Sequence, residues 1–234
     1  MRAFAALWSK ELKDFFVSPI AYLVIAIFLL VTGWFFFSTF FIKSQASLRD
    51  FFNLLPMTFA FVIPALTMRL FSEEFNLGSY EILITMPVSH PEVVLSKFLA
   101  GLALVAGMLL PTLVYVLFVS FLGDIDPGPV IGGYVGSLLL GAAYTAIGLL
   151  TSALTKNQIV AYILGTLLCF ALTLLNQLLF FIPETGLQVV QYLGATHHFE
   201  NIAKGIIDSR DLIYFLSIVF LGLYLTTLVI QDKT

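Results

Sequence analysis

The chain alternates between long apolar runs and short polar links. Six runs approach or exceed the roughly 20 residues that an α-helix needs to cross the hydrocarbon core of a bilayer. Inside a membrane the backbone must satisfy its own hydrogen bonds, so the pattern predicts an all-α membrane protein. The repeated segments of about ten alternating residues that indicate a transmembrane β-barrel do not occur. The expected spans are residues 20–42, 53–71, 98–122, 130–154, 158–182 and 212–230.

The cores of these six runs contain no Asp, Glu, Lys, Arg or His. Ionisable groups at membrane depth are costly and usually mark ion or proton pathways. Their absence disfavours an ion-coupled carrier or a proton relay. A metalloprotease is also disfavoured, because the sequence has no His-Glu zinc motif. Arg69 is expected at the end of the second span, where its side chain can reach the surface.

Composition supports the membrane assignment and narrows the chemistry. The chain of 234 residues is 60% hydrophobic and 11% charged, whereas soluble domains are nearer half apolar and a quarter charged. Its Lys and Arg residues are scattered, which is not the clustered basic face that nucleic-acid binding requires. The lone Cys169 is expected to be a packing residue. The neighbouring His197 and His198 lack clear further ligands, and with His90 they are expected in loops, so we predict no metal site.

Residues 1–17 predict an amphipathic helix in the membrane interface, with Trp8 as an anchor. Charged residues interrupt any apolar core of a signal peptide, at Lys10, Glu11, Lys13 and Asp14. With helical period the charges fall on one side and the apolar residues on the other: Phe4, Leu7, Trp8, Leu12, Phe15 and Phe16. Packing of this helix on another subunit is the alternative.

A few small and polar positions stand out within the spans. Small residues recur every four positions in the fourth span, at Gly133, Ser137, Gly141 and Thr145. Such a stripe lets helices approach closely and predicts a packing seam, within one chain or between two copies. Asn176 and Gln177 lie late in the fifth span, where they either bond between helices or line a substrate path. Kinks are expected at Pro56, Pro64 and Pro111.

The distribution of Lys and Arg predicts the orientation of the chain. Six spans place both termini on one side, which carries Arg2, Lys10, Lys13, Arg69, Lys97, Lys156 and Lys233. The other side carries Lys43, Arg49, Lys204 and Arg210. The positive-inside rule therefore places both termini in the cytoplasm, with loops 72–97 and 155–157. Loop 183–211 is then external, and its apolar spacing predicts two short helices in the outer interface.

The loop 72–97 carries the most specific local signals. Gly78 ends the preceding helix, Ser79 is suited to cap a new one, and Glu81 falls in its first turn. Pro87 stops it, so a separate helix is predicted over residues 80–86. Ser89 and Glu92 then form a capping-box pair at the start of the third membrane helix. The short helix is either an interfacial helix on lipid headgroups or a docking element for a cytoplasmic partner.

The motif Glu74-x-x-x-Gly78-Ser79-x-Glu81-x-Leu83-x-Thr85-x-Pro87-Val88 resembles the signature loop of ABC-2 type transporter permeases. The segments KELKDFFVSPIAYL and HFENIAKGIIDSRDLIYFLS resemble the branch with the gliding-motility-associated and nitrous-oxide-reductase-maturation permeases. The similarity runs through essentially the whole chain. Tyr80 departs from it, because an aliphatic residue is more common there.

This resemblance implies one ABC-2 type transmembrane domain over residues 1–234, in the bacterial inner membrane. Residues 1–17 would be the elbow helix, residues 79–87 the coupling helix, and loop 183–211 would hold short extracellular helices. The permease would pair with a second copy or a homologous permease, and with separate ABC ATPase subunits that bind ATP and Mg. The residues implied in coupling to the ATPase are Glu73, Glu74, Gly78, Ser79, Glu81, Leu83, Thr85 and Pro87.

The chain has no Gly-x-x-x-x-Gly-Lys-Ser/Thr phosphate loop, so ATP bound in that manner must be held by a partner. We therefore expect no catalytic residue and no cofactor in the chain itself. The expected function is export or extrusion of a substrate, driven by the partner ATPase. One alternative is a mechanotransmitter that passes ATPase motion to a periplasmic or membrane partner, such as gliding or secretion machinery. A second is a channel or carrier that works without ATP.

Overall fold

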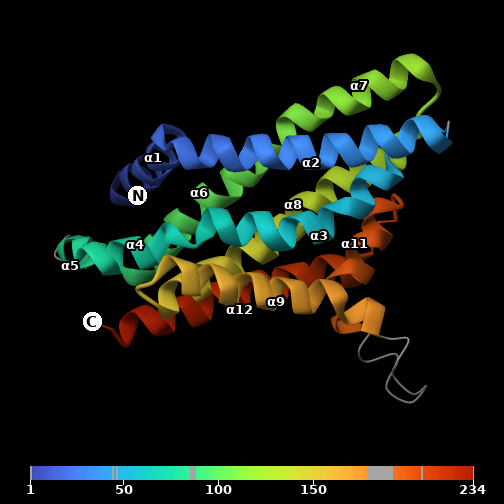
Figure 1. Cartoon of the computed structure of the whole chain (residues 1–234). Coiled ribbons are helices and arrows are strands. Elements are labelled where there is room, and N and C mark those ends of the chain that lie inside the picture. The colour runs from blue at the N-terminus through green and yellow to red at the C-terminus, as the bar shows by residue number, and fades with distance from the viewer. Residues whose placement is uncertain are drawn as a thin grey trace.

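The computed structural model describes residues 2–43, 45, 47–84, 88–178, 192–206 and 208–233. In this described part of the chain the regular elements are helices (Figure 1). They are α1 (Arg2–Val17), α2 (Pro19–Lys43), α3 (Arg49–Thr67), α4 (Arg69–Leu77), α5 (Ser79–Ile84), α6 (His90–Leu109), η1 (Leu110–Thr112), α7 (Leu113–Leu122), α8 (Pro127–Leu154), α9 (Gln158–Leu178), α11 (Ala195–Ala203) and α12 (Ser209–Gln231).

Six stretches of helix in the described residues are long and apolar enough to cross a membrane, which confirms the predicted number of spans. They are Pro19–Lys43, Arg49–Leu77, His90–Leu122, Pro127–Leu154, Gln158–Leu175 and Ser209–Gln231. The second and third extend well beyond the apolar runs, because helical geometry continues through the polar residues at their ends. An apolar run marks the part of a helix that suits lipid, not where its hydrogen bonding stops.

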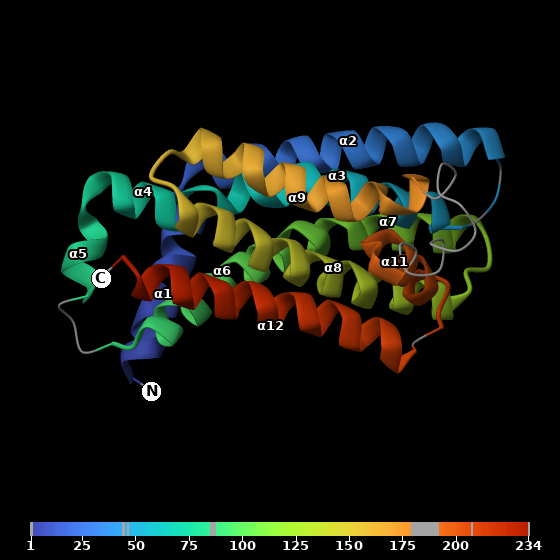
Figure 2. The same ribbon diagram turned by 90° about the horizontal axis from the view of Figure 1, so that it is seen from below.

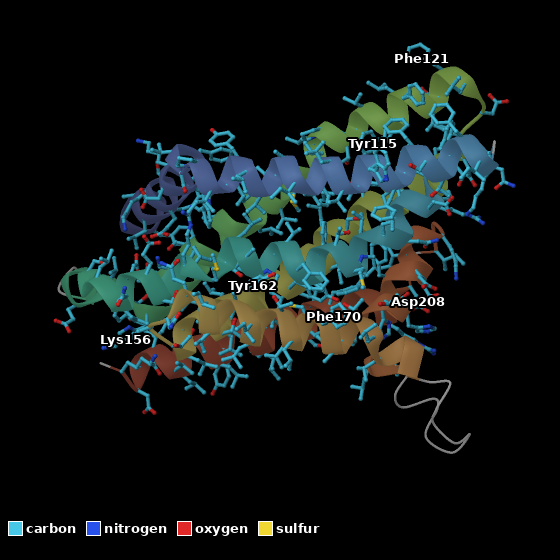
Figure 3. The ribbon with its side chains drawn as sticks, in the orientation of Figure 1. Tyr115, Phe121, Lys156, Tyr162, Phe170 and Asp208 are labelled. Carbon is cyan, nitrogen blue, oxygen red and sulfur yellow. The ribbon has the colours of Figure 1, made fainter. Side chains whose placement is uncertain are left out.

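The helices form an elongated bundle whose two ends differ (Figures 1 and 2). Both termini lie at one end, together with α4 and α5, and α11 lies at the opposite end. Figure 3 marks the first end with Lys156 and the second with Asp208. The two ends are called here the terminal end and the distal end. The shared position of the termini agrees with an even number of spans.

α8 is the central helix of the bundle (Figure 2). In an apolar stretch of 18 residues within its candidate span 72% of the residues are buried, against 22% in the corresponding stretches of α9 and α12. The small-residue stripe explains this position, because Gly133 and Gly141 let neighbouring helices approach. A Cβ added at Gly133 would lie 2.4 Å from the ring of Phe52. Ser137 and Thr145 are fully buried, so the stripe packs inside one chain.

α7 lies beside α2 on the outside of the bundle (Figures 1 and 3). Pro111 lies in η1, where the third span changes direction between α6 and α7. The ring of Tyr115 stacks on that of Phe36 with centroids 5.6 Å apart, and its hydroxyl donates to the Leu29 carbonyl at 3.3 Å. Phe121 is 88% exposed near the end of α7. Aromatic contacts therefore hold α7 against α2.

The helix α1 corrects part of the expectation for residues 1–17. It packs against α6 and buries Leu7, Glu11 and Phe15, three residues on one helical face. The prediction that its charged residues lie together on a polar face is wrong for Glu11, which is 5% exposed. Trp8 is partly exposed at 38%. A partner charge on α6 explains why this carboxylate is buried.

Several further expectations concern helix ends and loops. The prediction that the histidines lie in loops is wrong, because His90 begins α6 while His197 and His198 lie in α11. Cys169 is fully buried, as expected for a packing residue. Loop 183–211 contains α11, and much of the other short helix expected there falls in residues 179–191, outside the described part. Asn176 and Gln177 lie in α9, but their side chains are outside the described part of the structure.

Candidate functional site

The terminal end of the bundle brings most of the predicted coupling residues together on α4 and α5. Gly78 separates the two helices and has φ 69° and ψ 7°, a left-handed conformation that favours glycine. The predicted break at Gly78 is therefore confirmed. α5 begins at Ser79, one residue earlier than expected, and Ser79 and Glu81 are exposed. Thr85 and Pro87 lie outside the described residues, as does the side chain of Leu83.

Tyr80 holds α5 against α4. Its ring lies edge-on to Phe75, with centroids 4.9 Å apart, and within 6.2 Å of Phe71. Tyr80 is only 4% exposed although the residues on either side of it are exposed. The aromatic residue that departs from the resemblance therefore anchors the short helix and leaves Ser79 and Glu81 facing outward.

A buried ion cluster joins three helices directly behind this surface. Lys97 Nζ of α6 lies 2.8 Å from Glu74 Oε1 of α4 and 3.1 Å from both carboxylate oxygens of Glu11 of α1. The side chains of Lys97, Glu11 and Glu74 are 1%, 7% and 16% exposed. Lys10 approaches the same carboxylates at 3.6 and 3.8 Å from the solvent side. These contacts link α4 to α1 and to the third span.

A polar pocket of about 280 Å³ opens beside this cluster. Glu73 lines it together with Asp14 and Arg69. Arg69 Nη1 donates to Ser18 Oγ at 2.7 Å, and its guanidinium lies 5.4 Å from the ring centroid of Phe15. Arg69 therefore ties the start of α4 to the link between α1 and α2. It was expected at the end of the second span, but the helical stretch continues past it to Leu77.

The C-terminal end of α12 also reaches α4. Lys233 Nζ donates to the Ala153 carbonyl at 2.6 Å, at the end of α8, and lies 4.6 Å from the ring centroid of Phe75. Burial, with a smaller effect from the neighbouring charge of Lys156, lowers the pKa of Lys233. This lysine joins α12, α8 and α4 at the terminal end.

The start of α6 is capped as the sequence predicts. Ser89 N donates to Glu92 Oε2 at 2.9 Å, and both halves of the capping box are present. The capping box therefore fixes where α6 begins.

The distal end has its own buried polar group. His198 Nδ1 lies 2.6 Å from Asp211 Oδ1, and His198 Nε2 lies 2.9 Å from the Tyr192 carbonyl oxygen. The imidazole also stacks on Tyr214, with centroids 4.0 Å apart. Both ring nitrogens are occupied by these contacts, which join α11 to α12. No group of residues suited to a metal ion occurs in the described part of the chain.

Sequence reasoning missed the burial of Lys97 and Glu11. Lys97 was assigned to a loop, since it directly precedes the third apolar run, and Glu11 to a solvated face. Of the three residues in the cluster, Glu74 was the one that the sequence marked, because it stands in the motif of loop 72–97. In the structure its carboxylate accepts a hydrogen bond from Lys97.

A bundle of six candidate membrane helices, with an exposed short helix at the terminal end, defines a polytopic membrane protein. The family model described as ABC-2 family transporter protein matches residues 42–230, and the chain belongs to this family. Membership implies an ABC ATPase partner in general. A comparison with curated proteins finds no significant match.

Proposed function

We propose that the chain is the permease subunit of an ABC-2 transporter that draws its energy from a separate ATPase subunit. The observation that carries the proposal is the arrangement of α5. Its Ser79 and Glu81 are exposed at one end of the bundle, while Tyr80 fixes it to α4. In this proposal the ATPase binds ATP and Mg, and the chain contributes no catalytic residue.

Force applied to α5 would reach the membrane helices through α4. The Lys97 cluster ties α4 to α1 and α6, so these elements cannot move independently without separating buried charges. We infer that closure of the ATPase displaces α5, and that the resulting rocking of the spans extrudes a substrate. α5 acts here as the coupling helix and α1 as the elbow helix.

The same arrangement supports an orientation in the membrane. α4, α5 and both termini share one end of the bundle, and seven of the eleven Lys and Arg residues were assigned to that side. We propose that this end is cytoplasmic in a bacterial inner membrane. A second copy or a homologous permease would complete the membrane part of the transporter.

Copurification with charge-reversal variants tests the proposal. Tagged wild-type chain is expected to retain an ATP-binding subunit from its native membrane. Glu81→Arg is expected to insert normally but to uncouple ATP hydrolysis, and Gly78→Pro should do the same by distorting the α4–α5 junction. Asp124→Arg is the matched control, because Asp124 is an exposed acidic residue at the distal end. Failure to retain any ATPase, or identical hydrolysis in the Glu81→Arg and Asp124→Arg complexes, contradicts the proposal.

A mechanotransmitter that passes ATPase motion outward is the second candidate. It is favoured by the distal end, where the His198–Asp211 contact joins α11 to α12 and the Tyr214 hydroxyl of α12 donates to the Leu193 carbonyl at 2.6 Å. Such a structured surface suits contact with a periplasmic or membrane partner. ATPase stimulation by an outer partner without solute flux would favour this function over export.

A further inference from the structure

The junction between α3 and α4 contains a hydroxyl group from a third helix. Met68 N donates to the Pro64 carbonyl at 2.8 Å, so helical bonding continues through Met68. In an uninterrupted helix the Met68 carbonyl would next accept from Ser72 N. Instead Ser152 Oγ of α8 donates to Met68 O at 2.8 Å and accepts from Ser72 N at 3.1 Å and Phe71 N at 3.0 Å.

Insertion of a side chain into the helical hydrogen-bond ladder is an established cause of a helix break. Pro64, one turn earlier, weakens the same ladder because it has no N–H to donate to the Ala60 carbonyl. The second span is therefore divided into two helices at a joint, and Ser152 occupies that joint.

The joint lies directly on α8. A Cβ added at Gly148 would lie 2.0 Å from Thr67 Oγ1, so the two helices are in close contact one turn before Ser152. Ser152, Thr67 and Ser72 are 0–1% exposed, and the bonds at the joint are shielded from water. No solvent reaches the joint to replace the Ser152 hydroxyl, so its loss leaves the N–H groups of Phe71 and Ser72 to find new partners, while the Met68 carbonyl still accepts from the Ser72 hydroxyl.

α8 connects this joint to the far end of the bundle. Its 28 residues correspond to about 42 Å of helix. At the distal end Gly136 lies against Phe199 and Ile202 of α11. A displacement of α8 at Ser152 therefore acts on a helix that is in contact with both ends of the molecule.

We propose that Ser152 is the positioning residue through which the α4–α5 arm moves α8. The proposal rests on the function proposed above, because it assigns the route by which force from the ATPase passes from α4 to the central span. Ser152 touches no substrate in this role. It keeps the joint open and makes α4 and α8 move together.

The matched pair Ser152→Ala and Ser72→Ala isolates this role. Both serine hydroxyls donate to the Met68 carbonyl, and both residues are fully buried. Only the Ser152 hydroxyl comes from α8, so Ser72→Ala leaves the tie between the helices intact. Ser152→Ala lets the Met68 carbonyl pair directly with Ser72 N, which would close the ladder and change the angle between α3 and α4.

The measurement is the distance between spin labels at Leu77→Cys on α4 and Leu154→Cys on α8, in the full chain. Both positions are exposed and Cys169 is fully buried, so labelling is selective. α4 has nine residues and is about 13 Å long. A 20° change at the joint would move its end by about 5 Å. This shift, or a corresponding broadening, is expected for Ser152→Ala and not for Ser72→Ala.

The second readout uses the complex with its ATPase, without nucleotide and trapped with ATP and vanadate. The label distance should stay constant on trapping in the wild type and in Ser72→Ala, and change in Ser152→Ala. ATP hydrolysis should lose its coupling only in Ser152→Ala. Equal distances and equal hydrolysis in the two serine variants would overturn the proposal.

A substitute variant and a measurement on the permease alone cover the two ways in which this experiment could fail. If Ser152→Ala does not accumulate, Ser152→Cys keeps the volume with only a weak donor and acceptor, and the same broadening is expected. A wild-type distance distribution in that variant overturns the proposal. If no ATPase copurifies, the proposed function fails, while the label distances in the permease alone still decide whether Ser152 couples α4 to α8.

Discussion

Removal of the Lys97 ammonium tests whether the buried ion cluster holds the terminal end together. Lys97→Met keeps a long unbranched side chain but leaves Glu11 and Glu74 close together without their buried cation. The wild-type distances are 2.8 Å to Glu74 and 3.1 Å to Glu11, and Lys97 is 1% exposed. The two carboxylates would then repel each other in a region with little water.

The expected loss of stability follows from the geometry. Removing one partner of a buried ion pair costs about 3–5 kcal/mol. Lys10 remains 3.6 Å from Glu11 and 3.8 Å from Glu74, but its side chain is 51% exposed and compensates only in part. We therefore expect about 3 kcal/mol for Lys97→Met, which is roughly a hundredfold in the unfolding equilibrium.

Chemical unfolding of the purified chain in detergent measures this change. Lys13→Met is the matched control, because Lys13 is exposed on α1 and forms no ion pair with any residue that the structure describes. The double variant Glu11→Gln/Lys97→Met should recover part of the loss, since one uncompensated carboxylate is removed. A loss below about 1 kcal/mol for Lys97→Met, or a double variant no more stable than the single one, would refute the reasoning.

Three other substitutions have expected outcomes. Gly148→Ala should destabilise the chain by about 1–3 kcal/mol, measured by unfolding, because its Cβ would collide with Thr67 Oγ1; unchanged stability would mean that α3 and α8 do not pack so closely. Gly78→Ala should cost about 1 kcal/mol through its left-handed backbone alone, since nothing lies within 4 Å; a much larger loss would contradict this. Asp211→Ala should cost about 1–3 kcal/mol by leaving buried His198 Nδ1 without its partner, and should increase proteolysis at the distal end; wild-type resistance would show that the contact is dispensable.

Local sequence signals were enough to determine the membrane helices and the break at Gly78. Apolar run length predicts a span because the bilayer has a fixed thickness, and a capping box predicts a helix start because its two residues bond each other. The Ser89–Glu92 pair and the left-handed Gly78 depend on neighbours within a few positions. Family membership also follows from sequence, because the match covers residues 42–230.

The environment of the charged residues was decided by tertiary structure. Lys97 pairs with Glu11 and Glu74, which are 86 and 23 positions away in the chain. Helical period predicts that Glu11 lies on the solvated side of α1, but Glu11 shares the buried face with Leu7 and Phe15, where a lysine of another helix meets it. Burial of a carboxylate is tolerated only with such a partner, and the partner is known once the helices are packed.

The joint at Met68 illustrates the same division. Sequence alone marks Pro64 as a kink and gives no reason for a helix end at Thr67. The reason is the hydroxyl of Ser152, 84 positions from Met68, which enters the helical ladder. Sequence determined the six membrane helices, because each is stabilised in lipid by its own backbone bonds. The polar contacts that join those helices depend on long-range packing, and only the tertiary structure decided them.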